Sequence, residues 1–129
     1  MAKVLIVDDD PDIVEAMKIV LENKEYRVSV AKDGEEGLRK AEIEKPDLII
    51  LDVMMETKDK GFEVARKIKR NKSLGHIPII MLTAIKQNTG LDFKKEAGDD
   101  VWLPVDDYCD KPLNPEQLIS KVEQFIKIK

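Results

Sequence analysis

Short apolar runs alternate with segments of helical spacing along the whole chain, and this alternation constrains the fold more than any other feature. Runs of this length, bounded by turn residues, are typical of strands, and the segments between them predict helices. Five such strand–helix units predict an α/β fold built on an open, doubly wound parallel sheet, because parallel strands need crossover connections. The runs are Val4–Val7, Tyr26–Ala31, Asp47–Asp52, Ile77–Thr83 and a weaker one at Asp107–Lys111.

Caps and apolar stripes locate the helices between these runs. Asp10 or Asp12 is expected to cap the first helix, and Asn114 the last, where "NPEQ" is typical of a helix start. A fourth helix is expected within Gln87–Ala97, and Pro46 should end the second. The residues predicted to face the core are Ile13, Met17, Val20, Leu21, Leu38, Ala41, Ile43, Phe62, Val64, Ala65, Ile68, Leu118, Val122, Phe125 and Ile126.

Length and composition exclude several classes of protein. With 129 residues, 43% of them hydrophobic, the chain has room for one domain, expected to span residues 1–129. A net charge of −4 argues against direct binding of nucleic acid. No apolar run approaches the roughly 20 residues of a membrane span, and no signal peptide precedes the first strand, so a cytoplasmic setting is expected. One cysteine, Cys109, gives no ligand set for zinc, and one histidine, His76, excludes sites that need several imidazoles.

Polar residues follow the predicted strands at the end where such sheets bind ligands. Three consecutive carboxylates, Asp8 to Asp10, follow the first run, and Asp52 ends the third. Thr83 ends the fourth run, and Lys111 ends the fifth. Ligands bind outside the carboxyl ends of the strands in an open α/β sheet, so these side chains should converge there.

The converging residues suit a divalent cation and a phosphoryl group. Mg²⁺ prefers oxygen ligands, and it would neutralise acids that otherwise repel one another. Asp52 is then a candidate nucleophile that forms an aspartyl phosphate, with Lys111 and Thr83 binding the phosphoryl oxygens. Each residue also has an ordinary alternative: an N-cap for the acids, a strand residue for Thr83 and a solvated charge for Lys111.

Five segments in this order resemble the receiver domain of two-component response regulators, a chemotaxis-regulator-like family. They are "VLIVDDDPDI", "PDLIILDVMM" followed by "GFEV", "IPIIMLTA", "AGDD" and "YCDKPLNPEQL". The resemblance covers essentially the whole chain. It implies a flavodoxin-like three-layer sandwich with strand order 2-1-3-4-5 and five helices. Two stretches depart from the family pattern: a longer loop at Glu56–Lys60 and an insertion around Trp102.

The resemblance also implies a role for each site residue. Asp9, Asp52 and the backbone carbonyl of Met54 would bind Mg²⁺ directly, and Asp8 through a water molecule. Asp52 would take phosphate from a phosphohistidine, and Thr83 and Lys111 would bind that phosphate. Tyr108, with Thr83, would be the switch residue.

The implied function is a phosphorylation-driven signalling switch rather than a turnover enzyme, since it would only phosphorylate and dephosphorylate itself. Its partners would be a sensor histidine kinase or histidine phosphotransfer protein, and a target protein or output domain that reads the face around the fourth helix, the fifth strand and the fifth helix. A phosphorylation-independent interaction module with the same fold is the alternative, although the intact set of acids, Thr83 and Lys111 favours the switch. A flavin carrier is discarded, because the acids after the first strand would repel the flavin phosphate.

Overall fold

The computed structural model describes residues 2–52, 58–83, 107–110 and 114–126, and for residues 58–62, 83 and 107–110 it describes the backbone. The fourth helix expected within Gln87–Ala97 and the insertion around Trp102 lie outside these residues. The described elements are, in chain order, β1 (Lys3–Val7), α1 (Pro11–Asn23), β2 (Arg27–Ala31), α2 (Gly34–Glu44), β3 (Leu48–Asp52), α3 (Lys58–Arg70), β4 (Ile79–Thr83), β5 (Asp107–Asp110) and α5 (Pro115–Ile126).

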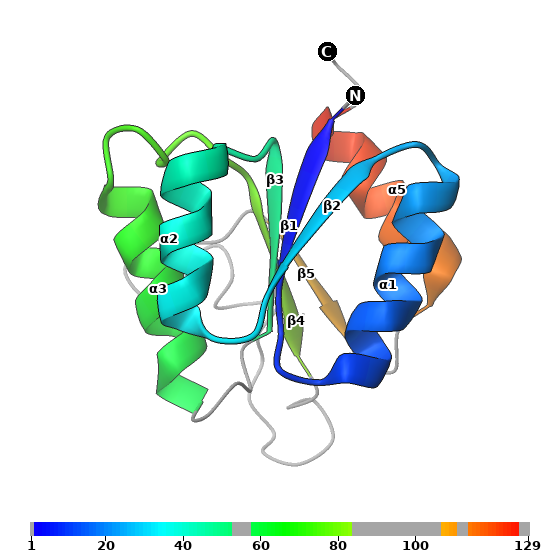
Figure 1. The fold of residues 1–129 in the computed structure, drawn as a ribbon, viewed down its shortest axis with the longest axis horizontal. Helices are drawn as coiled ribbons and strands as arrows, with labels where there is room; N and C mark the ends of the chain where they lie inside the picture. The colour runs from blue at the N-terminus through cyan, green and yellow to red at the C-terminus, as the bar shows by residue number, and fades with distance from the viewer. Residues whose placement is uncertain (1, 53–57, 84–106, 111–113, 127–129) are drawn as a thin grey trace.

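The five strands form one parallel sheet in the order β2-β1-β3-β4-β5, which confirms the predicted topology (Figure 1). The strand order reverses between β1 and β3, which pair directly with Val7 beside Leu51. Ligands bind at such a reversal, outside the carboxyl ends of the strands. The topology therefore brings the ends of β1 and β3 together at the expected place.

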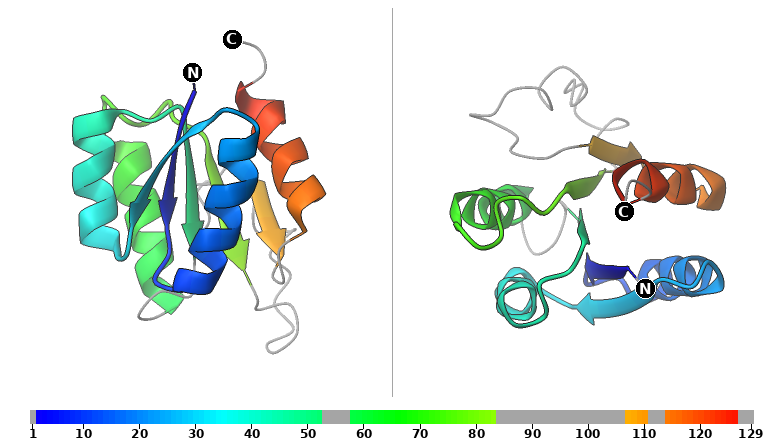
Figure 2. Two further views of the ribbon diagram at one scale, coloured as in Figure 1. Left: turned by 45° about the vertical axis from the view of Figure 1, so that its right-hand side comes forward. Right: turned by 90° about the horizontal axis from the view of Figure 1, so that it is seen from above.

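Helices cover both faces of the sheet, α2 and α3 on one side and α1 and α5 on the other (Figures 1 and 2). Successive residues of a strand point to opposite faces. In β1, Leu5 and Val7 accordingly belong to the core under α2 and α3, and Val4 and Ile6 to the core under α1 and α5. A sheet buried on both sides explains why the first, third and fourth runs are almost entirely apolar.

Among the side chains that the structure describes, the predicted stripe residues lie in the core or pack against it, except Val20, which is only partly buried, and Ile43; the side chain of Phe62 lies outside the described residues. Met17 and Leu21 of α1 are fully buried, as expected. The prediction that Ile43 faces the core is wrong, because this residue is 74% exposed. It follows the buried Ala41 by two residues, about 200° around the helix, and so lies on the opposite side.

Helix α2 lies very close to its neighbours because two of its residues are glycines. A Cβ added to Gly34 would stand 2.4 Å from Cγ2 of Val64 in α3, and one added to Gly37 would stand 2.9 Å from Cγ2 of Val7 in β1. Real Cβ contacts essentially never fall below 3.0 Å. The two glycines therefore set the distance at which α2 packs on the sheet and on α3.

Strand β2 forms one edge of the sheet, and a lysine covers part of it. The N–H of Arg27 bonds to the carbonyl of Ala2, and the carbonyl of Ala31 accepts from Asp8, so the alternation turns Val30 away from β1. The ammonium group of Lys40 in α2 donates to the outward carbonyl of Val30. One acceptor of the open edge is therefore already engaged.

Candidate functional site

Three carboxylates meet at the carboxyl edge of the sheet. Asp8 and Asp9 directly follow β1, and Asp52 is the last residue of β3. Because Val7 pairs with Leu51, the next residues, Asp8 and Asp52, extend side by side from adjacent strands. We call Asp8, Asp9 and Asp52 the acidic cluster; the sequence prediction that these acids converge is confirmed.

The acidic cluster is compact and mostly buried. One carboxylate oxygen from each residue lies within 4.8 Å of the other two. The side chains of Asp8 and Asp52 are each only 2% exposed, whereas Asp9 is exposed. At an effective dielectric near 20, two unit charges at this separation repel by roughly 3 kcal/mol. Added positive charge would therefore lower the mutual repulsion of the three carboxylates.

Backbone groups hold Asp8 in place on two sides. Its N–H donates to the carbonyl of Ala31 at the end of β2 (3.0 Å), and its Oδ1 accepts from the N–H of Asp10 (2.9 Å). Asp10 itself caps α1 as expected, its side chain accepting from the N–H groups of Asp12 (3.0 Å) and Ile13 (3.4 Å). The bond between Asp10 and Asp8 was not anticipated from the sequence, and its signal there is the third consecutive aspartate at a strand–helix junction.

The structure describes the backbone of two of the other predicted site residues, Thr83 and Tyr108. Thr83 is the last residue of β4. Because Asp52 pairs with Leu82, the backbone of Thr83 lies one residue beyond Asp52 at the same edge of the sheet. Tyr108 lies in β5, where it pairs with Met81 of β4. Met54 and Lys111 lie outside the described residues, although β5 ends at the residue immediately before Lys111. The structure thus brings the backbone of Thr83 to the edge that carries the acidic cluster.

The acidic cluster has the donor set that a magnesium ion requires. It offers three carboxylate oxygens from two adjacent strands, with two of the side chains buried and one open to solvent. Mg²⁺ is bound in proteins through one or two carboxylates, with water completing its octahedral shell. The exposed side, at Asp9, leaves room for those waters, so the residues fit this ion.

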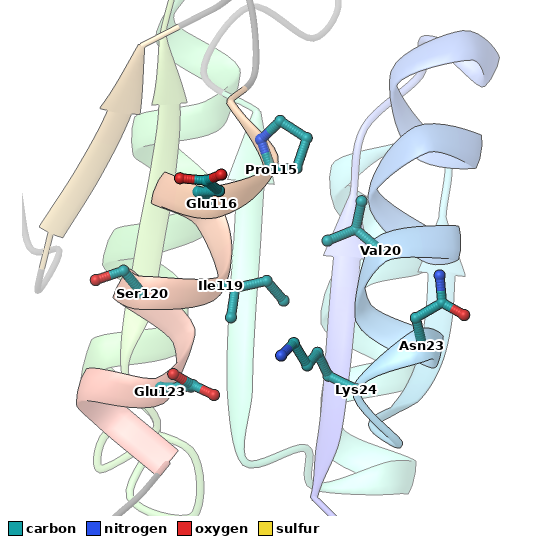
Figure 3. A pocket seen from close by; sticks show the side chains of 8 residues that line it. All are labelled: Val20, Asn23, Lys24, Pro115, Glu116, Ile119, Ser120 and Glu123. Atoms are coloured by element: carbon teal, nitrogen blue, oxygen red, sulfur yellow. The ribbon is translucent and has the colours of Figure 1, made fainter.

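A second concave feature, separate from the acidic cluster, lies between α1 and α5 (Figure 3). It is a groove of about 440 Å³ with an apolar base that includes Val20 and Ile119. Lys24 points across it from α1 toward α5, which carries Glu123 on the opposite wall. Asn23, Pro115, Glu116 and Ser120 complete its lining.

The chain matches the family model of the response regulator receiver domain over residues 4–123. It therefore belongs to the response regulator receiver family, and receiver domains are phosphoacceptor switches of two-component systems rather than turnover enzymes. The chain is 42% identical over 125 residues to the alkaline phosphatase synthesis transcriptional regulatory protein PhoP of Bacillus subtilis, covering 97% of this chain and 48% of PhoP. It is 36% identical over 127 residues to the DNA-binding dual master transcriptional regulator RpaA of Synechocystis, covering 98% of this chain and 50% of RpaA.

Solved structures agree with this assignment. The chemotaxis protein CheY4 of Vibrio cholerae superposes with a TM-score of 0.83 at 35% identity, covering 97% of this chain and 98% of CheY4. The receiver domain of the sensor histidine kinase PA1611 of Pseudomonas aeruginosa superposes with a TM-score of 0.81 at 26% identity, covering 98% of each chain, and it has a magnesium ion coordinated in its active site cleft. Receiver domains thus bind Mg²⁺ at an acidic pocket of the kind that the acidic cluster forms here.

The curated relatives are longer than this chain, which spans about half the length of PhoP and of RpaA. The expectation of no nucleic-acid binding does not extend to these relatives, since RpaA is named as DNA-binding. Within the described residues, no helix combines the length and apolar character that crossing a membrane requires.

Proposed function

We propose that Asp52 is the phosphoacceptor of this receiver domain and that residues 1–129 form a single receiver unit. The observation that carries the proposal is the acidic cluster, in which Asp52 ends β3 within 4.8 Å of two further carboxylates. Asp52 stands at the centre of the sheet, at the reversal of strand order, where such folds bind ligands.

Asp8, Asp9 and Asp52 would hold Mg²⁺ in this proposal, with the backbone carbonyl of Met54 as a further ligand. When bound, the ion supplies positive charge that offsets the repulsion among the acids and polarises the phosphoryl oxygens. Asp9 and Asp52 would be direct ligands, and Asp8 would act through a bound water. Asp8 is held for this task by the N–H of Asp10.

The transfer step joins a carboxylate oxygen of Asp52 to phosphorus and breaks the P–N bond of a phosphohistidine on the donor protein. The imidazole leaves with the bonding electron pair and takes up a proton. Lys111 and the hydroxyl of Thr83 would contact the phosphoryl oxygens, so that catalysis is mainly positioning and charge stabilisation. The backbone position of Thr83 at the edge that carries Asp52 supports its part.

The same contacts would make the switch. A phosphorylated Asp52 carries roughly one and a half to two negative charges in place of one, and it offers new acceptor oxygens. Thr83 would move toward them, and Tyr108 would change its side-chain position in step. The face around the fourth helix, β5 and α5 would then be read by a target. Loss of the phosphoryl group by the domain's own hydrolysis would reset it.

The partners follow from this chemistry. A sensor histidine kinase or a histidine phosphotransfer protein would donate the phosphoryl group, in the cytoplasm, and a target protein or an output domain would respond. By likeness to RpaA, a DNA-binding output is one form that this response can take. The net charge of −4 disfavours DNA contact by the receiver unit itself. A phosphorylation-independent interaction module remains the alternative, and the acidic cluster argues against it because three carboxylates at this edge suit the binding of a divalent cation.

Intact mass measurement after incubation with acetyl phosphate tests the proposal. Wild-type protein with Mg²⁺ should gain the mass of one phosphoryl group, and Asp52→Asn should gain none. Asp12→Asn is the matched control, since Asp12 is an exposed acid of α1 outside the acidic cluster, and it should be phosphorylated like the wild type. No gain in the wild type, or an equal gain in Asp52→Asn, would contradict the assignment.

A further inference from the structure

The turn between β1 and α1 links the acidic cluster to the start of a helix through one residue, Asp10. Its backbone N–H donates to Oδ1 of Asp8 at 2.9 Å. Its side-chain Oδ1 accepts from the N–H groups of Asp12 and Ile13, and its carbonyl accepts from Val14 at 3.0 Å. Asp10 thus bonds forward into α1 and backward to a buried member of the acidic cluster.

We propose that Asp10 is a positioning residue for the metal site, an inference that rests on the proposed function. Its side chain fixes the turn against α1, and the fixed turn aims the N–H of Asp10 at Oδ1 of Asp8. With one oxygen held in this way, the carboxylate plane of Asp8 is set, and its other oxygen is directed by the same constraint. Asp10 acts through Asp8 and is not itself a metal ligand.

The reason for assigning this role to the side chain is the geometry of the cap. At the cap, Asp10 has φ −90° and ψ 107°, an extended conformation that differs from the helix after it. A residue without a side-chain acceptor leaves the N–H groups of Asp12 and Ile13 to water and lets the turn fluctuate. The N–H of position 10 would still be present, but it would no longer be held toward Asp8.

Asp10 also carries a negative charge, and that charge is a rival explanation for any effect on a cation. Asparagine separates the two, because it caps a helix about as well as aspartate but is neutral. If the cap matters, Asp10→Asn should resemble the wild type and Asp10→Ala should not. If only the charge matters, both variants should weaken Mg²⁺ binding alike.

Asp33 supplies a matched control for the general loss of a helix cap. It follows β2 as Asp10 follows β1, and its side chain caps α2 by accepting from the N–H of Glu36 at 2.8 Å. Among the described residues, Asp33 makes no hydrogen bond to the acidic cluster like the one that the N–H of Asp10 donates to Asp8. Asp33→Ala should therefore destabilise the fold about as much as Asp10→Ala without acting on Asp8.

The test measures Mg²⁺ affinity by isothermal titration calorimetry without any phosphodonor, together with urea unfolding in a chelator. Asp10→Ala is expected to raise the magnesium dissociation constant by about three- to tenfold, at or below the lower end of the roughly 10- to 100-fold that residues behind metal ligands contribute. The magnesium dissociation constants of Asp10→Asn and Asp33→Ala should each stay within about twofold of the wild-type value. If Asp10→Ala does not fold, Asp10→Gly takes its place, because glycine is tolerated at a helix cap but has no side-chain acceptor.

Three results would overturn the inference: wild-type affinity in Asp10→Ala, equal weakening in Asp10→Asn, or equal weakening in Asp33→Ala. Failure of the proposed function is recognised separately, because the wild type itself would then show no magnesium binding and no phosphorylation, or Asp52→Asn would be phosphorylated like the wild type. Wild-type binding and phosphorylation with an unaffected Asp10→Ala would refute the positioning role alone.

Discussion

Asp52→Asn removes one carboxylate from the acidic cluster and keeps the shape of the side chain. Without Mg²⁺ the variant should be more stable than the wild type, because it loses the repulsion from Asp8 and Asp9. Each pair at 4.8 Å or less repels by roughly 3 kcal/mol at an effective dielectric near 20. Solvent screens the pair with the exposed Asp9, and Asp8 and Asp52 both make further interactions, so only part of this repulsion is expected to be released. A net gain of about 1–2 kcal/mol in the free energy of unfolding is expected.

Urea and thermal unfolding in a chelator measure this gain, which corresponds to a rise of about 4–8 °C in the midpoint temperature. Added Mg²⁺ should largely cancel this difference in the free energy of unfolding. At ten times its dissociation constant, an ion that binds only the folded state stabilises the wild type by about 1.4 kcal/mol. The variant, with one ligand fewer, should gain much less.

Asp12→Asn is the control here too, since it removes an exposed carboxylate four residues from Asp8. Asp12→Asn should not raise the free energy of unfolding in the chelator, because Asp12 lies outside the acidic cluster. Its negative charge stabilises the positive N-terminal end of α1. The reasoning fails if Asp52→Asn is no more stable than the wild type in the chelator. It also fails if Asp12→Asn gains as much, because the effect would then come from net charge.

Three further predictions concern the stability of the fold. Gly34→Ala should lower the free energy of unfolding by about 1–3 kcal/mol in urea, because the new Cβ meets Val64, and adding Val64→Ala should restore part of the loss. Lys45→Gly should raise the free energy of unfolding by about 0.5–1 kcal/mol, because Lys45 caps the C-terminus of α2 in the left-handed region at φ 48°. An unchanged urea midpoint would argue against backbone strain at this residue. Burial, and then the charge of Glu123, raises the pKa of Tyr26 above its ordinary 10.0. Because the phenol then ionises first in the unfolded chain, the free energy of unfolding should fall as the pH rises above 10. Tyr26→Phe should reduce that fall between about pH 9 and about pH 11.

Much of the fold could be predicted because its signals are local. The buried strands β1, β3 and β4 are nearly uninterrupted apolar runs, and the caps at Asp10 and Asn114 bond as their residue types suggest. Asn114 accepts from the N–H of Gln117 at 3.1 Å, as "NPEQ" predicts. Convergence of the acids followed from topology, since adjacent parallel strands end at the same edge.

The errors and omissions concern the packing of helices and the path of one turn. Ile43 looked like a core residue by its type, but the inward side of α2 is taken by glycines and Ala41 that fit against β1 and α3. The N–H bond from Asp10 to Asp8 depends on the path of one turn, which residue types alone do not determine. The groove between α1 and α5 depends on how two helices from opposite ends of the chain pack, and no local pattern encodes that distance.

Lys40, which covers part of the edge strand β2, affects how the protein can associate with other molecules at high concentration. A sheet with an open margin can recruit a strand from a neighbouring molecule, and long stacks of chains begin in this way. Lys40 occupies the carbonyl of Val30 through which such a recruit would bond, and it presents a positive charge to any incoming backbone. This contact therefore disfavours the addition of a further strand at that position of the edge.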